Sequence, residues 1–291
     1  MGTLLGHVVP GLAFTVLGLW HTLNTTKSYN LNGPSTFSST TWFPSSTLKH
    51  LELYLLISFG LLAAVLQLLD YPHFAFSFHP DNFEHATMFL HVIIYASAAL
   101  AADSASPTYA GLVGVLASSV FGQEFFLLHY HSADHTGLEG HYHWLLQLIV
   151  AASALATVMT TGFPGSFVAA LVRSVSVMFQ GVWLFVMGLA LWVPVLVPKG
   201  CYAVSSTERG RGAVACHTEE ASMRAVALAN LQHSWTLAAI CIFVACLCLR
   251  PMPSVKSPLK YRKLEEPPVS NLEISHDDSV SAQLKQVAAA F

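Results

Sequence analysis

The amino-acid sequence predicts an all-α, polytopic membrane protein: a bundle of seven transmembrane helices followed by a disordered C-terminal tail. Of its 291 residues, 54% are hydrophobic and only 10% are charged, whereas about 25% are charged in a typical soluble domain. The mean hydropathy is +0.54, and the apolar residues form long blocks, as in helices surrounded by lipid. The net charge of −3 argues against nucleic acid as a partner.

Seven blocks approach or exceed the roughly 20 residues that span a bilayer. They are Leu4–His21, Lys49–Asp70, Phe83–Ala102, Thr108–Tyr130, Tyr142–Thr161, Val172–Val197 and Arg224–Leu249. The segments between them carry polar and turn residues, such as DYPHFAFSFHPDN, DSASP and GFPGS, where helices are expected to stop. Residues 1–250 are therefore expected to form the transmembrane domain. Residues 251–291 contain Pro, Ser and mixed charge, which predicts a disordered tail.

The distribution of Lys and Arg predicts the orientation of the bundle. With the C-terminus in the cytosol, nine Lys and Arg residues, Arg173 among them, lie on the cytosolic side and four lie on the other. This bias agrees with the positive-inside rule and depends on the basic run Lys256–Lys263. The sequence therefore predicts a multi-pass protein of the secretory pathway or the plasma membrane, with a cytosolic tail.

Two short features follow from that orientation. Cys201 and Cys216 share a predicted non-cytosolic loop, where an oxidising compartment permits a disulfide. Tyr261–Leu264 has the form of a Tyr-x-x-Leu sorting signal. It predicts a trafficking adaptor as a partner of the tail.

Histidine is unusually frequent, with 15 residues against 13 Lys and Arg. The stretch LLHYHSADHTGLEGHYHW holds five histidines and two carboxylates. At 1.5 Å per residue, His91, Glu124, Gln147 and His233 lie about 12, 9, 8 and 13 Å inside four different spans. An unpaired carboxylate at such a depth costs several kcal/mol. We therefore expect a polar site in the non-cytosolic half of the bundle, with His91, Glu124 and His233 as its floor.

Histidine together with Asp or Glu suits zinc and other first-row metals. The candidate metal ligands are His85, His91, Glu124, His129, His131, His141, His143 and His233. A bound metal would activate water for hydrolysis of a lipid-like or amphiphilic substrate, with Glu124 or Glu84 as general base. The simpler alternative is a hydrogen-bonded cluster that holds the helices together. Other histidines near span ends, and Glu52, are interpreted as interfacial, with a separate cytosolic-side site at His50 and Glu52 as the alternative.

Three other functions remain open. A haem-binding electron carrier would use His91 and His233 as axial ligands. A proton-linked transporter would use titrating His and Glu side chains as a relay. A non-catalytic scaffold would act through its tail. The sequence does not decide whether the protein is an enzyme.

Two motifs carry a family resemblance. The segment GHVVPGLAFTVLGLWH at residues 6–21, and the paired His-x-His pattern whose second half is Leu138-Glu139-x-His141-x-His143, resemble the transmembrane protein 45 family. The similarity extends over about residues 1–250. It implies a seven-span membrane protein and assigns no reaction. The matching positions are His7, Pro10, His129, His131, Glu139, His141 and His143.

Overall fold

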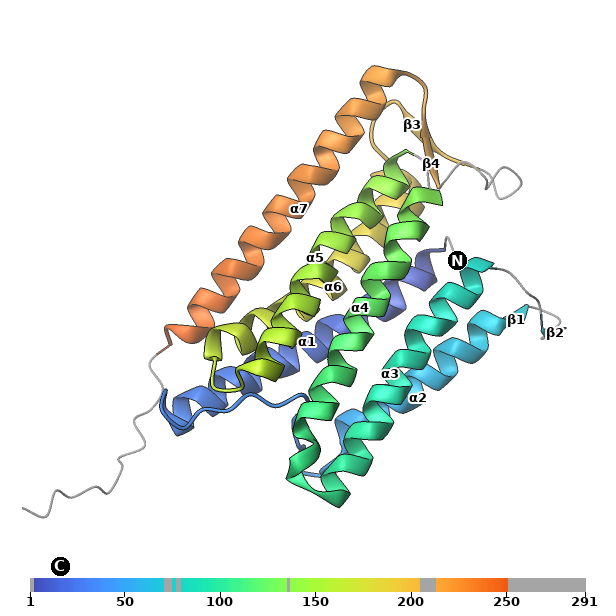
Figure 1. Cartoon of the computed structure of the whole chain (residues 1–291). Coiled ribbons are helices and arrows are strands. Elements are labelled where there is room, and N and C mark those ends of the chain that lie inside the picture. The colour runs from blue at the N-terminus through green and yellow to red at the C-terminus, as the bar shows by residue number, and fades with distance from the viewer. Residues whose placement is uncertain (1–2, 71–74, 77–79, 135–136, 205–212, 251–291) are drawn as a thin grey trace, which may run out of the picture. The chain divides into compact units, whose positions relative to one another are not determined.

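The computed structural model describes residues 3–70, 75–76, 80–134, 137–204 and 213–250. Within this part of the chain, seven helices are long and apolar enough to cross a membrane. This confirms the predicted all-α, multi-pass architecture (Figure 1). The predicted disordered tail, with Tyr261–Leu264, lies outside the described residues.

Connecting segments of different lengths join the helices, and two of them carry small hairpins. Their bounds are α1 (Leu4–Asn32), α2 (Leu51–Leu68), α3 (Pro80–Ala105), α4 (Ala110–Asp134), α5 (Leu138–Gly162), α6 (Phe167–Trp192) and α7 (Glu219–Cys248). Single 3₁₀ turns lie at Pro107–Tyr109 and Pro194–Leu196. The antiparallel hairpins pair β1 (Leu69–Asp70) with β2 (Ala75–Phe76), and β3 (Cys201–Ala203) with β4 (Val214–Cys216).

Local sequence explains where several helices begin and end. Thr3, Ser166 and Thr218 each accept a hydrogen bond from a backbone N–H three residues on, which caps α1, α6 and α7. The predicted sixth span reached Val197, but α6 stops at Trp192 and a 3₁₀ turn starts at Pro194. Proline lacks the N–H that continuation of the helix requires, and its ring clashes with the preceding turn.

Helix α1 is longer than predicted, because it continues from His21 to Asn32. The added turns are polar, yet Thr22, Thr25 and Thr26 are buried. The hydroxyl of Thr22 donates to its own helix at the carbonyl of Gly18, 2.7 Å away. The Thr25 hydroxyl lies 3.3 Å from the Ser174 hydroxyl of α6. These hydrogen bonds let a polar segment pack within the bundle.

Glycine brings α1 and α6 into close contact. A Cβ atom at Gly18 would lie 2.2 Å from the backbone nitrogen of Met178, and one at Gly181 would lie 2.2 Å from that of Thr15. Small residues at such a crossing allow two membrane helices to pack backbone to backbone. From this pair, helix contacts continue from α6 to α5, α4, α3 and α2 in turn, whereas α7 packs on α5 and α6 (Figure 1).

The larger buried hydrophobic cluster is centred on α5 and α6, and a smaller one lies among α2, α3 and α4. Trp183 is fully buried and donates a 3.1 Å hydrogen bond to the carbonyl of Tyr142. Below it, the Gln180 amide donates to Ser153, and the Ser153 hydroxyl donates to Ser176. Buried hydroxyl and amide groups therefore join these two helices through hydrogen bonds.

The side chain of Arg173 does not lie at the surface of the bundle, where the charge count placed it. It is buried in α6 and donates to the Thr160 hydroxyl at 3.1 Å and to the Thr40 carbonyl. A buried cation satisfied by protein acceptors contributes nothing to the surface charge that orients a membrane protein. The positive-inside bias therefore depends even more strongly on the basic run after α7.

The loop between α6 and α7 carries the β3–β4 hairpin. Cys201 lies opposite Cys216, and the two are joined by a disulfide. The backbone N–H of Ala213, just before β4, donates to the buried Glu139 carboxylate of α5 at 2.6 Å. The hairpin is therefore attached to the start of α5.

Candidate functional site

A pocket of about 420 Å³ lies near the starts of α1, α3 and α5 and the ends of α2 and α4. We call this pocket the histidine pocket, and the end of the bundle that contains it the histidine end. Apolar side chains form most of its wall. Its polar lining residues are Thr3, His7, Gln67, His85, Glu124 and His143. The fold thus brings three of the predicted site residues, His85, Glu124 and His143, from three helices to one pocket.

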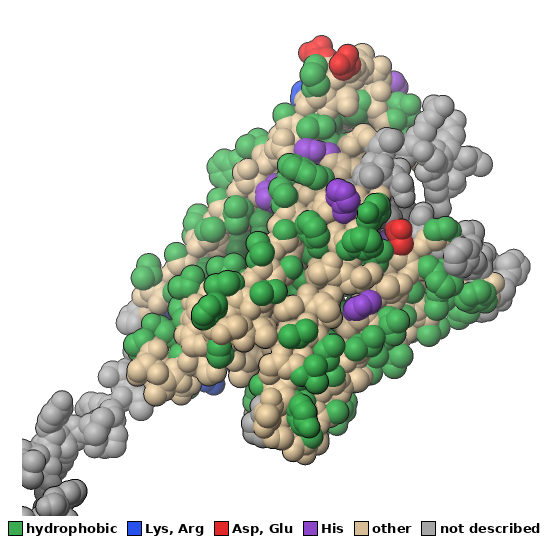
Figure 2. All heavy atoms as spheres, viewed as in Figure 1, with side chains coloured by type: hydrophobic (Ala, Val, Ile, Leu, Met, Phe, Trp, Pro, Cys, Tyr) green, Lys and Arg blue, Asp and Glu red, His purple; other side chains and the backbone are tan. Residues whose placement is uncertain are grey.

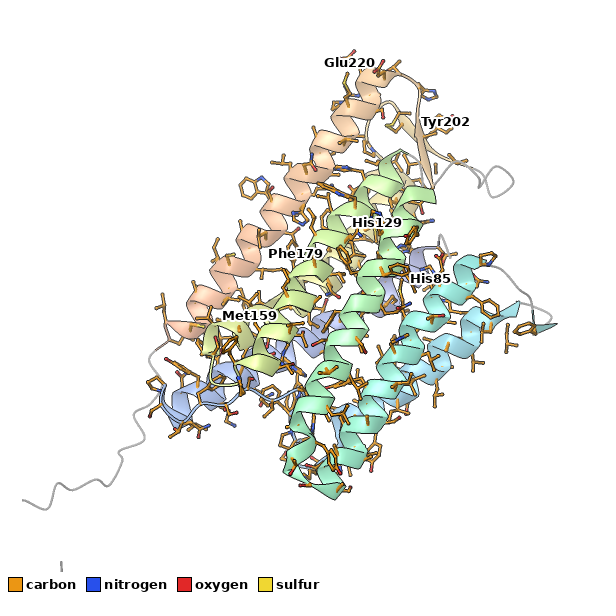
Figure 3. All side chains as sticks on the ribbon, viewed as in Figure 1. His85, His129, Met159, Phe179, Tyr202 and Glu220 are labelled. Carbon is orange, nitrogen blue, oxygen red and sulfur yellow. A yellow bond between two sulfur atoms is a disulfide. The ribbon has the colours of Figure 1, made fainter. Side chains whose placement is uncertain are left out.

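Figures 2 and 3 show the setting of this end. Hydrophobic side chains are spread over the visible face, and histidines gather in the half nearer to the start of α7 (Figure 2). His85 on α3 and His129 on α4 both lie toward this end, whereas Met159 lies toward the opposite one (Figure 3). On the face that Figure 2 shows, the histidines are therefore concentrated toward one end of a largely apolar bundle.

Two histidines of the pocket are held by their own helices. The Nδ1 of His7 lies 3.0 Å from the carbonyl of Thr3, and the Nδ1 of His143 lies 2.9 Å from that of Glu139. Because a carbonyl only accepts, Nδ1 carries the hydrogen in both rings, and Nε2 is the acceptor nitrogen of each neutral imidazole. The two ring centroids are 5.8 Å apart. His7 also stacks on Trp192, with a centroid distance of 4.4 Å.

Glu124 supplies the carboxyl group of the pocket from α4. Its side chain is buried, with 9% of the residue exposed, and it lines the cavity. No described residue donates a hydrogen bond to it. A buried carboxyl group without a donor is costly, so water or a ligand in the pocket would stabilise it. Gln147, expected in the same layer, instead donates to the Phe125 carbonyl at 3.2 Å and joins α5 to α4.

The structure does not bring His91 and His233 into the pocket. His91 bonds through Nδ1 to the Thr87 carbonyl of its own helix, at 2.9 Å. His233 lies against α6, where its ring centroid is 4.9 Å from that of Phe179 and 5.0 Å from that of Trp183. Its Nε2 is buried and has no hydrogen-bond partner among the described residues. The sequence placed His91 and His233 at a depth similar to that of Glu124, but each side chain contacts other neighbours than the pocket.

The remaining predicted ligands also lie outside the pocket wall. His141 bonds to Asn230 of α7 at 2.7 Å and so joins α5 to α7. His129 is exposed and packs near Tyr130. Glu84, the second candidate general base, belongs to α3 and does not line the cavity. His131 belongs to α4, but its side chain lies outside the described residues.

The residues that are described do not fit a multi-ligand metal centre. Across that part of the chain, no three His, Cys, Asp or Glu side chains come close enough together to hold a metal ion. The two proposed axial haem ligands lie on helices with different neighbours. Helix α3 packs on α2 and α4, whereas α7 packs on α5 and α6. His91 and His233 are therefore not placed as a facing pair.

A family comparison matches the second half of the bundle. Residues 110–249 match the profile of a family described as "Family of unknown function (DUF716)". The match begins at the first residue of α4 and ends just after α7. It includes Glu124 and His143 of the pocket, whereas His7, Gln67 and His85 lie before it. That description names no activity, so the chemistry of the pocket carries the functional inference.

Two residues that line the pocket, His7 and Gln67, were not predicted from the sequence as part of the site. His7 was interpreted as interfacial, although the family resemblance already marked it as a matching position. It is 7% exposed because Trp192 and His143 pack around it. Gln67, near the end of α2, gave no sequence signal, because a single amide in an apolar block has no distinctive pattern.

Proposed function

We propose that this chain is an integral membrane protein of the transmembrane protein 45 family that binds an amphiphilic molecule in the histidine pocket. The polar group of the ligand lies against His7, Glu124 and His143. Its apolar chain lies between α1 and α2. The observation that supports this proposal most strongly is a mostly apolar cavity with ionisable groups from separate helices among its lining residues.

The size and lining of the cavity suit such a ligand. Its volume of about 420 Å³ falls within the range of about 300–1,000 Å³ that is typical of small-molecule sites. Such sites combine an apolar wall with a few polar groups that orient the ligand. Here the wall includes Phe14, Phe59 and Phe89, which can pack against a hydrocarbon chain.

The polar lining selects the head group by hydrogen bonding. His7 and His143 line this part of the pocket with their imidazole rings, and the Glu124 carboxyl receives no hydrogen bond from a described residue. A ligand that donates a hydrogen bond, such as a long-chain alcohol or amine, complements the Glu124 carboxyl beside these two rings. A carboxylate or phosphate head would meet the Glu124 carboxyl instead, with unfavourable charge if that group is ionised.

The ligand enters from the bilayer between α1 and α2. Leu5 and Val9 of α1 and Leu62 and Leu66 of α2 line the pocket and are also exposed on the bundle surface. Helices α1 and α2 make only sparse contact with each other. An apolar chain can therefore pass from lipid into the pocket without crossing water.

Photolabelling tests this proposal. The probe is a long-chain alcohol with a diazirine in its tail, added to the full-length protein in detergent. Labelled peptides are expected from α1 and α2 around Val9 and Leu62. Leu62→Trp fills the opening and should reduce the labelling, whereas Leu61→Trp places the same ring on the neighbouring exposed position outside the pocket. Equal labelling of the two variants would contradict the proposal.

Metal-dependent hydrolysis remains a separate prediction from the sequence. Elemental analysis and an absorbance spectrum of the purified protein test zinc and haem directly. Zinc bound one-to-one and lost in His143→Ala would make the hydrolase the better proposal, and a Soret band would favour the electron carrier.

We also propose that the C-terminus faces the cytosol, because Lys256–Lys263 follow α7 closely. A tag placed after Phe291 should then bind antibody only in permeabilised cells. Labelling of intact cells would reverse the orientation. In the proposed orientation Tyr261–Leu264 is accessible to a trafficking adaptor, so Tyr261→Ala should change the compartment and leave photolabelling unchanged.

A further inference from the structure

Three cavities lie one after another in the bundle. A second cavity, of about 80 Å³, shares Phe14, Val92 and Val120 with the histidine pocket. A third, of about 290 Å³, shares Thr41 and Arg173 with the second. Each cavity therefore adjoins the next through common wall residues.

The lining residues follow the same order along each helix. On α3 they run from His85 in the histidine pocket through Tyr95 in the second cavity to Asp103 in the third. On α4 they run from Leu128 back to Ala110. Both helices are long enough to cross a membrane. The cavities therefore extend from the histidine end toward the opposite end of the bundle.

A buried carboxylate lies in the second cavity. Glu52 of α2 accepts hydrogen bonds from Trp20 Nε1 at 2.9 Å, from His21 Nε2 at 2.8 Å and from the backbone N–H of Phe43 at 3.0 Å. Glu52 and His21 are 7% and 9% exposed, so the interfacial interpretation of both is wrong. The connection before α2 covers them, because Phe43 is bonded to Glu52 and the Thr41 carbonyl is bonded to α3.

The other charged or titratable groups around Glu52 come from three helices. His21 belongs to α1. Tyr95 of α3 donates to the Thr41 carbonyl at 2.6 Å, and Arg173 of α6 donates to Thr160 and Thr40. The cavity wall from α4 and α5 consists of Ala117, Val120, Phe121 and Thr157, none of which titrates. A carboxylate, an imidazole, a phenol and a guanidinium thus share one small buried space.

This arrangement suits a proton better than a larger solute or a metal ion. A cavity of about 80 Å³ has room for a few water molecules. Three donors already occupy the Glu52 carboxylate, two at Oε2 and one at Oε1, which leaves few positions for a cation to coordinate. A proton needs no vacant coordination position, because it can pass along an existing imidazole–carboxylate hydrogen bond.

We propose that the row of cavities conducts protons between the two ends of the bundle, with Glu52 and His21 as the relay. Water in one cavity gives a proton to the Glu52–His21 pair, and the pair gives a proton to water in the next. Only O–H and N–H bonds form and break, and the pair returns to its starting state. The electrochemical gradient drives the transfer, so no co-reactant is required.

The walls on either side of the relay support this assignment. Phe14, Val92 and Val120 are the apolar residues shared by the second cavity and the histidine pocket, and an apolar boundary can gate conduction by excluding water. On the other side, the third cavity is lined by hydroxyl groups and by Asp103, which is bonded to Lys49 and His50. The polar lining can hold water that carries the proton onward.

Proton flux into vesicles tests the proposal. Full-length protein is reconstituted into phosphatidylcholine vesicles that contain a pH-sensitive dye, and a valinomycin-mediated potassium diffusion potential drives protons inward. The dye should respond faster than in protein-free vesicles. Glu52→Gln should lose this excess flux, whereas Glu220→Gln, an exposed carboxyl at the start of α7, should retain it. Wild-type flux equal to that of empty vesicles would overturn the proposal.

A second pair of variants keeps the test decisive if Glu52→Gln does not fold. Val120→Phe enlarges a side chain in the wall shared by the two cavities and should reduce the proton flux. Val115→Phe is the control, because it adds the same ring to an exposed position of the same helix. Equal proton flux in these two variants would contradict conduction along the row of cavities. Photolabelling of the histidine pocket should be unchanged in Glu52→Gln, so failure of proton conduction and failure of amphiphile binding give different results.

Discussion

The imidazole rings of His7 and His143 lie edge to face, with centroids 5.8 Å apart, although they belong to the first and fifth helices. Each ring is oriented by a hydrogen bond from Nδ1 to a carbonyl one helical turn earlier. The helices therefore determine which ring nitrogen is protonated. Two imidazole rings of defined tautomer therefore line the same pocket as the Glu124 carboxyl.

Removal of one of these rings should weaken ligand binding. His143→Ala is expected to lower the affinity for the photoreactive alcohol about fivefold, since a neutral hydrogen bond contributes about 1 kcal/mol. Competition with unlabelled alcohol measures the change. His129→Ala is the matched control, because His129 is exposed and lies outside the pocket wall. An equal loss in both variants would rule out a specific contact.

Glu124→Leu should change stability and ligand binding in opposite directions. It is expected to raise the unfolding temperature in detergent, because it replaces a buried carboxyl that no described donor satisfies with an apolar side chain, a gain of about 1–3 kcal/mol. It should also weaken binding of the alcohol. Glu139→Leu should have the opposite effect on stability, because Glu139 accepts from Ala213 N at 2.6 Å. A fall in the unfolding temperature of Glu124→Leu would indicate a structural role.

The α1–α6 crossing should not tolerate a methyl group. Gly18→Ala would place a Cβ 2.2 Å from the Met178 backbone nitrogen, and such overpacking costs about 1–3 kcal/mol. Thermal unfolding in detergent should show a lower midpoint. Gly122→Ala is the control, since a Cβ there meets no atom within 4 Å. Unchanged stability of Gly18→Ala would mean that the two helices can separate without cost.

Reduction of the disulfide should loosen the β3–β4 hairpin. Its half-cystines are 15 residues apart, and a loop of that size is stabilised by about 3 kcal/mol in the chain-entropy model. A reducing agent should therefore lower the unfolding temperature of the wild type and have no effect on a Cys201→Ser, Cys216→Ser double variant. Two free thiols in protein prepared without reductant would contradict the bond.

The seven helices could be predicted from the sequence because the ability to span a bilayer is a local property. A run of about 20 apolar residues satisfies its own backbone hydrogen bonds and its lipid surroundings without reference to another segment. The same reasoning located the loop that contains Cys201 and Cys216. It failed at the end of α1, where Thr22, Thr25 and Thr26 are polar in sequence but buried against a neighbour.

The composition of the site was decided by the tertiary structure. The rise per residue determines the depth of a side chain, so the sequence could place His91, Glu124 and His233 in one layer. The direction of each side chain depends on how its helix is rotated against its neighbours, and close packing contacts such as Gly114 of α4 against Thr161 of α5 set that rotation. The fold therefore directs Glu124, but not His91 or His233, into the histidine pocket, and buries Glu52 and Arg173, which the sequence alone placed at the membrane surface.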